Sequence, residues 1–416
     1  MSASITAPAD LSPLAEDGRS ALWRSLGATA EETRELLEYA RSEFDLSRAP
    51  AGFPLPDEPF VAAWTRYVEE AGRVGVWACL RDRLVQLRFP IEPGVSESPA
   101  YRAATRRGVW PAPESRGLEL ARPAELRLFL AETPVGRVPV ILATTREDFV
   151  ALVRALAHKN EPWAIPDAVG AIIIGGYNNW DRIASLRRAW EASDSTSGSP
   201  VEWAARWREI VREPGLYQDR FIVLGSGPYS GEAAADVGLG ESEWAQSSIS
   251  IRLEHECTHH FTRRVLGSMR NRLADELIAD YMGIVAATGS FRADWLVRFL
   301  GLERYPVYRP GGRLEKYRGD LALDGGSFRV LCAAAWRCAR NLEAIDRLRP
   351  PWTRSPGSAV DDRGLPPGGS AAEGQRGLID KAEMILALAA IGLEGLAGES
   401  AVDMYRTARQ RRLGAA

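Results

Sequence analysis

Apolar residues recur every three or four positions through the N-terminal quarter of the chain, which is the spacing of amphipathic helices. This spacing predicts a mostly helical region over residues 1–117, with its clearest helices at 31–44 and 59–87. A stretch rich in proline, glycine and serine, 89–116, follows them and is typical of a connecting segment. The pattern leaves open whether this region supports the rest of the chain or covers it.

The spacing changes after residue 118, where short apolar runs are bounded by turn residues. These runs predict strands at 126–130, 138–142, 171–174 and 221–224, with a helix at 146–158. The last run, extended to 221–226, is a candidate for the rim of a cleft, where an extended substrate adds as a further strand. An ordinary inner strand is the alternative interpretation.

Two further amphipathic segments predict helices at 247–266 and 271–288. Gly267 and Gly289 follow them, and glycine in the left-handed conformation commonly ends a helix. Because the connection between the two segments is short, we expect the helices to be neighbours in space.

The first of these helices carries two histidines four positions apart. His255 and His259 therefore lie on one face and can bind one metal ion, while Glu256 points beside them toward a bound water. Glu276, on the second helix, can supply a third ligand, which leaves a fourth position open, as in a catalytic zinc site. The chain has only four histidines, so chance rarely produces this pattern.

The sequences HECTH at 255–259 and ELIAD at 276–280 resemble the HExxH and ExxxD pattern of the gluzincin branch of zinc metallopeptidases. The resemblance implies zinc ligation by His255, His259 and Glu276. It also implies that Glu256 is the general base and that Asp280 orients a ligand histidine through its other ring N–H. With the order of the elements, it favours an α+β, zincin-like core, in which a mixed sheet precedes the two helices.

The chain is accordingly expected to have four parts. A helical N-terminal region, 1–117, precedes a zincin-like metallohydrolase domain at 118–349. Residues 350–377 are dense in proline, glycine and serine, which predicts a linker. Residues 378–416 predict C-terminal helices.

Many gluzincins place a histidine or tyrosine further along the chain to stabilise the oxyanion, but this sequence has no histidine after His260. The candidates in and just after the loop 304–313 are Tyr305, Tyr308, Tyr317, Arg309 and Arg313. Tyr308 is taken as the catalytic candidate. A solvated surface loop without a catalytic role is the alternative interpretation.

Two other features have both a structural and a functional interpretation. The segment 175–181 combines glycine, asparagine and aromatic residues, so it lines a pocket or forms a turn in which Asn179 caps a helix at 180–190. The four cysteines lack the spacing of a metal site. Cys257, although inside the motif, is directed away from the histidine face and is expected to be a buried thiol.

Composition limits the class of partner and the compartment. A net charge of −3 gives no reason to expect a nucleic acid or an anionic membrane as a binding partner. The N-terminus lacks the features of a secretory signal, and the apolar segment 384–396 is too short and interrupted to span a bilayer. We therefore expect a cytoplasmic protein, long enough to form two or more lobes.

These features predict a zinc-dependent hydrolase that acts on a peptide or amide substrate. Two alternatives stay open: a tailoring enzyme dedicated to one intracellular peptide or small amide, and a non-catalytic protein that keeps a zincin fold as a scaffold. Glu256 argues against the scaffold, because a structural zinc site needs no base beside it. The sequence leaves the oligomeric state undetermined.

Overall fold

The computed structural model describes residues 16–111, 116–193, 200–269, 272–318, 323–349 and 371–413. Within these ranges the fold is α+β, with fourteen α-helices and one four-stranded sheet. The chain divides into two compact units. Unit 1 combines residues 16–55 with most of the chain from Glu232 onward, and unit 2 runs from Pro56 to Gly231. The range 118–349, expected to form one domain, thus contributes residues to both units.

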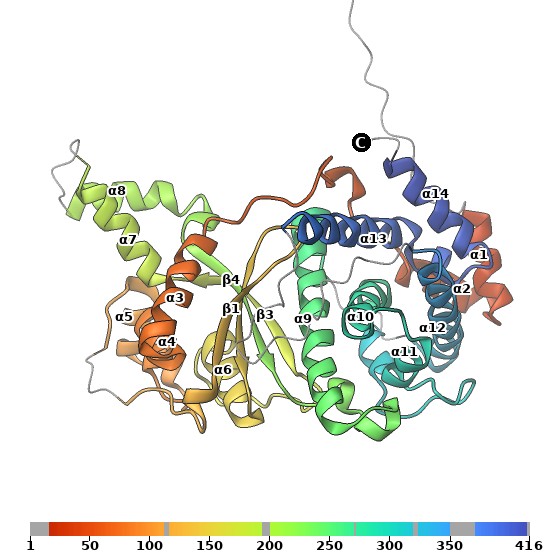
Figure 1. The fold of residues 1–416 in the computed structure, drawn as a ribbon, viewed down its shortest axis with the longest axis horizontal. Helices are drawn as coiled ribbons and strands as arrows, with labels where there is room; N and C mark the ends of the chain where they lie inside the picture. Colours follow the sequence, from red (N-terminus) through yellow and green to blue (C-terminus); the bar gives the residue numbers. More distant parts are fainter. Residues whose placement is uncertain are drawn as a thin grey trace, which may run out of the picture. The chain divides into compact units, whose positions relative to one another are not determined.

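The sheet belongs to unit 2 and is mixed (Figure 1). Its strands, in spatial order, are β1 (Arg127–Ala131), β2 (Val138–Ala143), β4 (Gln218–Gly225) and β3 (Ala171–Asn178). β1 and β3 run antiparallel to their neighbours, whereas β2 and β4 are parallel to each other. All four strands expected from the sequence are present, the last two with longer bounds.

Strand β4 is an inner strand, so of the two interpretations of 221–226 the ordinary inner strand is confirmed and the rim of a cleft is wrong. Ile222 pairs with Val140 of β2 on one side and with Ile173 of β3 on the other. Residues 221–224 are fully buried, as a continuous apolar strand covered on both faces should be. Because both edges of β4 are already paired, an extended substrate cannot add there.

Unit 2 also contains six described α-helices. They are α3 (Val61–Val74), α4 (Val76–Arg83), α5 (Pro99–Arg107), α6 (Arg146–Ala157), α7 (Trp180–Glu191) and α8 (Pro200–Ile210). The single helix expected at 59–87 is two helices, because Gly75 adopts a φ of 89° and ends α3. The connection expected at 89–116 contains α5, which begins with Ser98 as N-cap and Pro99 in its first turn.

Unit 1 contains the other eight described α-helices. They are α1 (Glu16–Ser25), α2 (Ala30–Tyr39), α9 (Glu241–Leu266), α10 (Leu273–Thr288), α11 (Ala293–Leu300), α12 (Gly325–Asp346), α13 (Ala371–Ala397) and α14 (Ala401–Leu413). α9 and α10 are the two helices expected at 247–266 and 271–288, and both end at left-handed glycines. Residues 371–377, expected in the linker, belong to α13, whereas 350–370 lie outside the described residues.

Helix α13 is apolar because it packs inside unit 1. Leu386, Leu388 and Leu396 each have 0 % of their surface exposed. Their burial accounts for the apolar segment 384–396. In the part of the chain that the structure describes, no helix is both long and apolar enough to cross a membrane.

A buried acid, Asp219 of β4, organises the polar interior of unit 2. It accepts hydrogen bonds from Trp64 Nε1 at 2.8 Å and Asn179 Nδ2 at 2.6 Å, and it forms an ion pair with Arg182. Asn179 Oδ1 in turn accepts from the first backbone N–H groups of α7. Asn179 is therefore a helix cap, as one interpretation of the segment 175–181 predicted, but residues 175–178 are the irregular end of β3 and not a turn.

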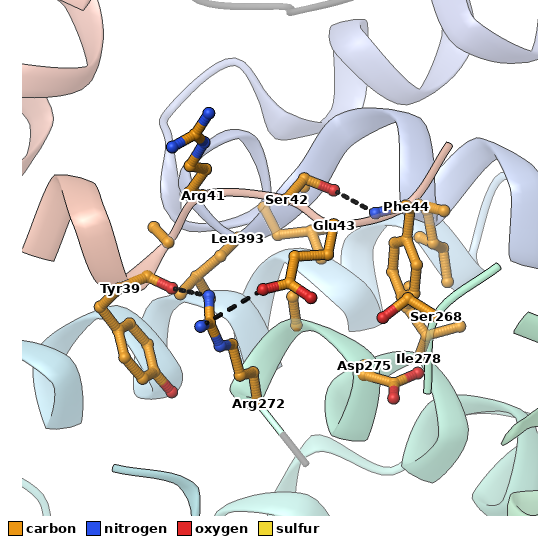
Figure 2. A pocket seen from close by; sticks show the side chains of 16 residues that line it. Tyr39, Arg41, Ser42, Glu43, Phe44, Ser268, Arg272, Asp275, Ile278 and Leu393 are labelled. Carbon is orange, nitrogen blue, oxygen red and sulfur yellow. Dashed lines mark hydrogen bonds and ion pairs between the residues drawn. The ribbon is translucent and has the colours of Figure 1, made fainter. Parts of the chain in front are cut away.

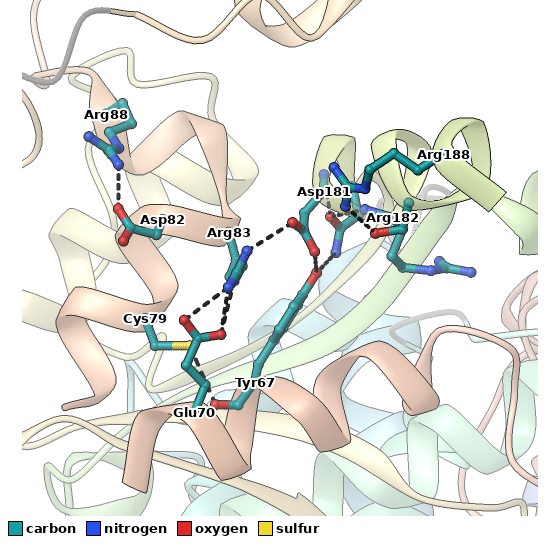
Figure 3. Close-up of polar contacts among 11 residues, drawn as sticks. Tyr67, Glu70, Cys79, Asp82, Arg83, Arg88, Asp181, Arg182 and Arg188 are labelled. Atoms are coloured by element: carbon teal, nitrogen blue, oxygen red, sulfur yellow. Dashed lines mark hydrogen bonds and ion pairs between the residues drawn. The ribbon is translucent and has the colours of Figure 1, made fainter. Parts of the chain in front are cut away.

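Figure 3 shows how this network continues toward the surface of unit 2. The hydroxyl of Tyr67 donates to Asp181 Oδ2 at 2.8 Å. Arg83 lies between two carboxylates, 3.1 Å from that of Asp181 and 2.7 Å from that of Glu70. Because each of these side chains has a partner within the network, we interpret it as a stabilising feature of the unit.

The importance of the Asp219 pair can be measured by removing the acid. Asp219→Ala leaves Arg182, whose side chain is 8 % exposed, without its carboxylate. We expect the free energy of unfolding to fall by about 3–5 kcal/mol, the usual cost of breaking a buried ion pair. Glu209→Ala breaks only the exposed pair with Arg206 and should cost less than about 1 kcal/mol. Urea denaturation of both variants measures the difference, and equal effects would contradict this role.

Candidate metal centre

Helices α9 and α10 pack closely enough to bring their functional side chains together (Figure 1). Gly283 of α10 faces the backbone of α9, and a Cβ at this position would lie 2.7 Å from the carbonyl oxygen of Ile251. A larger residue would push the helices apart. The close approach places the acidic face of α10 opposite the histidine pair of α9.

The three expected ligands converge on one point. The Nε2 atoms of His255 and His259 are 3.0 Å apart, and carboxylate oxygens of Glu276 lie 3.5 Å from the first and 3.6 Å from the second. Around a tetrahedral zinc ion with Zn–N distances of about 2.0–2.1 Å, donor atoms are separated by about 3.3–3.4 Å. These three residues can therefore hold a metal ion, with their ligand atoms within 4.8 Å of one another.

A carboxylate lies beside the other ring nitrogen of each histidine, within hydrogen-bond geometry at His255 and at a longer ion-pair distance at His259. His255 Nδ1 is 2.9 Å from Asp280 Oδ1, and His259 Nδ1 is 3.4 Å from Asp275 Oδ2. A proton held on Nδ1 by a carboxylate leaves the lone pair of Nε2 for a metal ion. Asp280 thus lies where the resemblance implied, and Asp275 is an additional partner that the sequence analysis missed.

Asp275 is 3 % exposed and immediately precedes the ligand Glu276. Its Oδ1 accepts a hydrogen bond from Thr262 Oγ1 of α9 at 3.3 Å. Neighbouring positions on a helix point about 100° apart, so the two acids leave α10 in different directions. The adjacent acids were a signal in the sequence, but only the packing of α9 shows that both reach the histidine pair.

Arg313, in a 3₁₀ helix (Arg313–Tyr317), is the cation beside these acids. Its Nη2 contacts Asp280 Oδ2 and lies 3.9 Å from Glu276 Oε2. Burial alone would raise the pKa of both carboxyls, but the neighbouring histidines and Arg313 outweigh burial. They lower the pKa of Glu276 to about 2 and that of Asp280 well below its usual range. Both acids are therefore ionised, as a metal ligand and its orienting acceptor must be.

Glu256 is partly buried beside the histidine pair. Burial raises the pKa of its carboxyl, an effect that the two histidines and Arg252 oppose. Around the pair, four carboxylates (256, 275, 276 and 280) face two arginines (252 and 313). With neutral histidines the cluster has an excess of negative charge, which a divalent cation would balance.

The structure brings one of the five oxyanion candidates, Arg313, into contact with the cluster. The hydroxyl of Tyr308, the candidate favoured by the sequence, donates to the carbonyl oxygen of Gly312 at 2.7 Å and is not directed at the histidines. The other candidates also have identified partners: Arg309 pairs with Glu232 and Glu303, Tyr305 stacks on Trp336, and Tyr317 accepts a hydrogen bond from Arg313.

Tyr39, the last residue of α2, connects Arg313 to the start of α10. Its hydroxyl donates to the carbonyl oxygen of Tyr317 at 2.5 Å and accepts from the N–H of Leu273 at 3.2 Å. The hydroxyl of Tyr317 accepts from Arg313 Nε at 2.8 Å. A residue more than two hundred positions before the motif thus helps to fix the cluster, and no local pattern in the sequence could have indicated it.

Cys257 lies inside the motif but is not among the three residues that can hold a metal ion. It is a buried free thiol, as expected from its position on the helix. Burial raises the pKa of this thiol well above its ordinary value, so it stays protonated and is a poor ligand.

Comparison with known proteins places the chain in a family. A family model described as a family of unknown function (DUF7005) matches residues 21–359. The chain belongs to this family. The DUF7005 match includes both helices of the candidate metal centre and Arg313. No curated protein and no solved structure matches the chain, so function has to be inferred from the centre itself.

If the cluster holds a metal ion, removing Asp280 or Asp275 should weaken its binding, measured with zinc as the probe, without unfolding unit 1. We expect Asp280→Ala and Asp275→Ala each to lower zinc affinity about 10- to 100-fold, because such residues orient ligands and do not supply them. Competition with a chromophoric chelator measures the affinity, and a His255→Ala/His259→Ala double variant gives the baseline. Asp294→Ala, at an exposed position of α11, should match the wild type. Wild-type affinity in both test variants would assign the two acids a purely structural role.

Proposed function

We propose that this protein is a zinc-dependent hydrolase of peptide or amide bonds. The observation that carries the proposal is the convergence of two imidazole nitrogens and the Glu276 carboxylate. Structural zinc sites are usually closed by four protein ligands, whereas three ligands with an open position are typical of catalysis. Glu256, a carboxylate beside the ligands but not among them, supplies the base that hydrolysis needs.

The chain's own residues handle the proton in this reaction. A bound zinc ion would supply a water with a pKa lowered toward about 7 and would polarise the carbonyl of the substrate. Glu256 would accept the proton of the attacking water and deliver it to the leaving nitrogen. Because Glu256 directly follows His255 on the helix, the backbone fixes the direction in which its side chain leaves α9.

We assign two roles to Arg313: it holds Asp280, and its positive charge stabilises the negative charge that forms on the substrate oxygen. Its guanidinium is permanently positive and is held by the hydroxyl of Tyr317 and the carboxylate of Asp280. By occupying Oδ2 of Asp280, it leaves Oδ1 to His255. Its charge also favours the negative charge that develops on the substrate oxygen. Tyr308 is the weaker candidate for stabilising the oxyanion, because its hydroxyl already donates a hydrogen bond to the carbonyl oxygen of Gly312.

The base is tested by Glu256→Gln, which keeps size and hydrogen-bonding capacity but cannot accept the proton. Zinc should stay bound, and turnover should fall by about 10²- to 10⁴-fold. Substrates come from a peptide library with products identified by mass spectrometry, and zinc is measured by elemental analysis. A zinc-loaded Glu256→Gln variant with the wild-type rate would overturn the mechanism.

The matched control is Glu254→Gln, which removes an acid two positions away that pairs with Lys381. This variant should retain the wild-type rate. If the wild type binds zinc but cleaves no library peptide or amide, the scaffold alternative is favoured. Cleavage restricted to one defined substrate would instead favour a dedicated tailoring enzyme.

A second pair of variants separates the two charge-stabilising candidates. Removing an oxyanion donor typically lowers kcat about 10²- to 10³-fold. We expect Arg313→Met to reach this range, whereas Tyr308→Phe should lower kcat less than about tenfold, because it removes only the bond to Gly312. Zinc content is measured in parallel, so that lost metal is not mistaken for a lost donor. The reverse order would restore Tyr308 as the catalytic residue.

A further inference from the structure

Unit 2 contains a cavity of about 400 Å³ beside α4. Small-molecule sites typically have volumes of about 300–1,000 Å³, so an organic ligand has room here. Trp77 and Arg81 of α4 form one wall. Residues 116–120 and Pro123 form the other wall, and none of these residues belongs to the candidate metal centre.

The hollow beside α10, shown in Figure 2, is different. Its volume is about 40 Å³, which leaves no room for an organic molecule. Its guanidinium, that of Arg272, already contacts the carbonyl oxygen of Tyr39 and the carboxylate of Glu43. Of these two spaces, the cavity beside α4 is therefore the candidate for a small-molecule site.

The wall opposite α4 is fixed by hydrogen bonds at two points. The backbone N–H of Leu118 donates to the carbonyl oxygen of Leu87 at 3.2 Å. Further along, the N–H groups of Ala121 and Arg122 donate to the buried carboxylate of Asp148 at 2.6 and 2.9 Å. Because the chain's own contacts hold this wall in place, a ligand would lose little affinity to the ordering of loops.

Apolar side chains on both walls keep surface available to a ligand. Trp77 and Leu120 pack against the hydrophobic core of the unit but are only partly buried. Pro123 is also partly buried. Because all three line the cavity, their remaining surface can contact a flat apolar group.

Arg81 is the main polar feature of the cavity and lies one turn after Trp77 on the same face of α4. Its Nε atom is buried without a hydrogen-bond partner, and its guanidinium forms no ion pair with any residue that the structure describes. By contrast, Arg83 pairs with Glu70 and Asp181 (Figure 3). A guanidinium is permanently positive, so Arg81 places an unbalanced positive charge in the wall.

The position of this charge is set by the close approach of Gly117. A Cβ at this position would lie 3.2 Å from Arg81 Nη2 and 3.4 Å from Nε, so the missing side chain lets the guanidinium pack against the opposite wall. The acid of the lining, Glu119, is 80 % exposed and lies 3.8 Å from Arg116, which also pairs with Glu92. The lining thus favours an anion over a cation.

We propose that this cavity binds a small molecule that combines a flat apolar group with an oxyanion, a carboxylate or a phosphate. The apolar group packs between Trp77 and Leu120. The oxyanion accepts charged hydrogen bonds from Arg81 and supplies the negative charge that this guanidinium lacks. The proposal does not depend on the zinc centre, because every residue of the cavity belongs to unit 2.

The proposal is tested with 3-phenylpropionate and phenyl phosphate as probes and with neutral 3-phenylpropanamide as their control. Each compound is titrated calorimetrically into the full-length protein. At least one anion should bind about tenfold or more tightly than the amide, because it gains charged hydrogen bonds to Arg81. The anion that binds more tightly identifies the oxyanion class.

Variants locate the bound probe. Arg81→Gln should weaken binding of the anion about tenfold or more, whereas Arg81→Lys should give an intermediate affinity, because lysine keeps the charge without the fork. Trp77→Leu should weaken binding by removing the aromatic surface. Arg206→Gln removes an exposed arginine of α8 in the same unit and should match the wild type. Circular dichroism checks that each variant is folded.

The outcomes separate this proposal from the proposed function. The His255→Ala/His259→Ala double variant should bind the anion as the wild type does, and loss of binding in it would place the probe at the metal centre. The cavity assignment is also overturned if neither anion binds, if the amide binds equally well, or if Arg81→Gln leaves the affinity unchanged. If the wild type binds no zinc, the proposed function fails, while these titrations still decide whether the cavity is an oxyanion site.

Discussion

The contact between α9 and α10, in which carboxylates of one helix hold the imidazoles of the other, is the interaction on which the candidate centre depends. His255 pairs with Asp280 and His259 with Asp275, so the partners run in opposite directions along the two helices. Glu276 lies between these pairs and faces both Nε2 atoms. A change in the distance between the helices would therefore alter ligand position and histidine orientation together. The missing side chain at Gly283 makes this distance possible.

This arrangement places more negative charge in the interior than its own cations balance. His259, Glu276 and Asp280 are 5 %, 5 % and 1 % exposed, and buried charges are stable only when they are paired. Burial by itself lowers the pKa of His259, but Asp275 and Glu276 raise it well above its ordinary value. The same carboxylates thus favour a proton on the imidazole and a metal ion beside it. Protons and metal compete for one nitrogen, as at other histidine sites.

The sequence predicted the site residues whose relative positions are determined by a single helix. It did not predict those that come together only when separate segments pack. The four-residue spacing of His255 and His259 places them on one face in any helix, so no tertiary information was needed. Asp275, Arg313 and Tyr39 reach the cluster only because separate segments pack together. The fold follows the same division. Strand positions were predicted from apolar runs, but the place of β4 inside the sheet depends on pairing, and the break between α3 and α4 depends on a single glycine.

Unit 1 is assembled from chain segments that precede and follow unit 2 in the sequence. The metal-binding helices belong to the later segment but contact the earlier one. The backbone N–H of Asp45 donates to the carbonyl oxygen of Leu266 at the end of α9, and the ring of Phe53 packs 5.4 Å from that of Phe261. Tyr39 joins the start of α10 to the segment of Arg313. A fragment confined to 118–349 would contain every expected ligand but none of these three contacts. Each lost hydrogen bond would cost about 0.5–1.5 kcal/mol of net stability. The motif therefore supplies the ligands, while the distant N-terminal segment helps to hold them in one geometry.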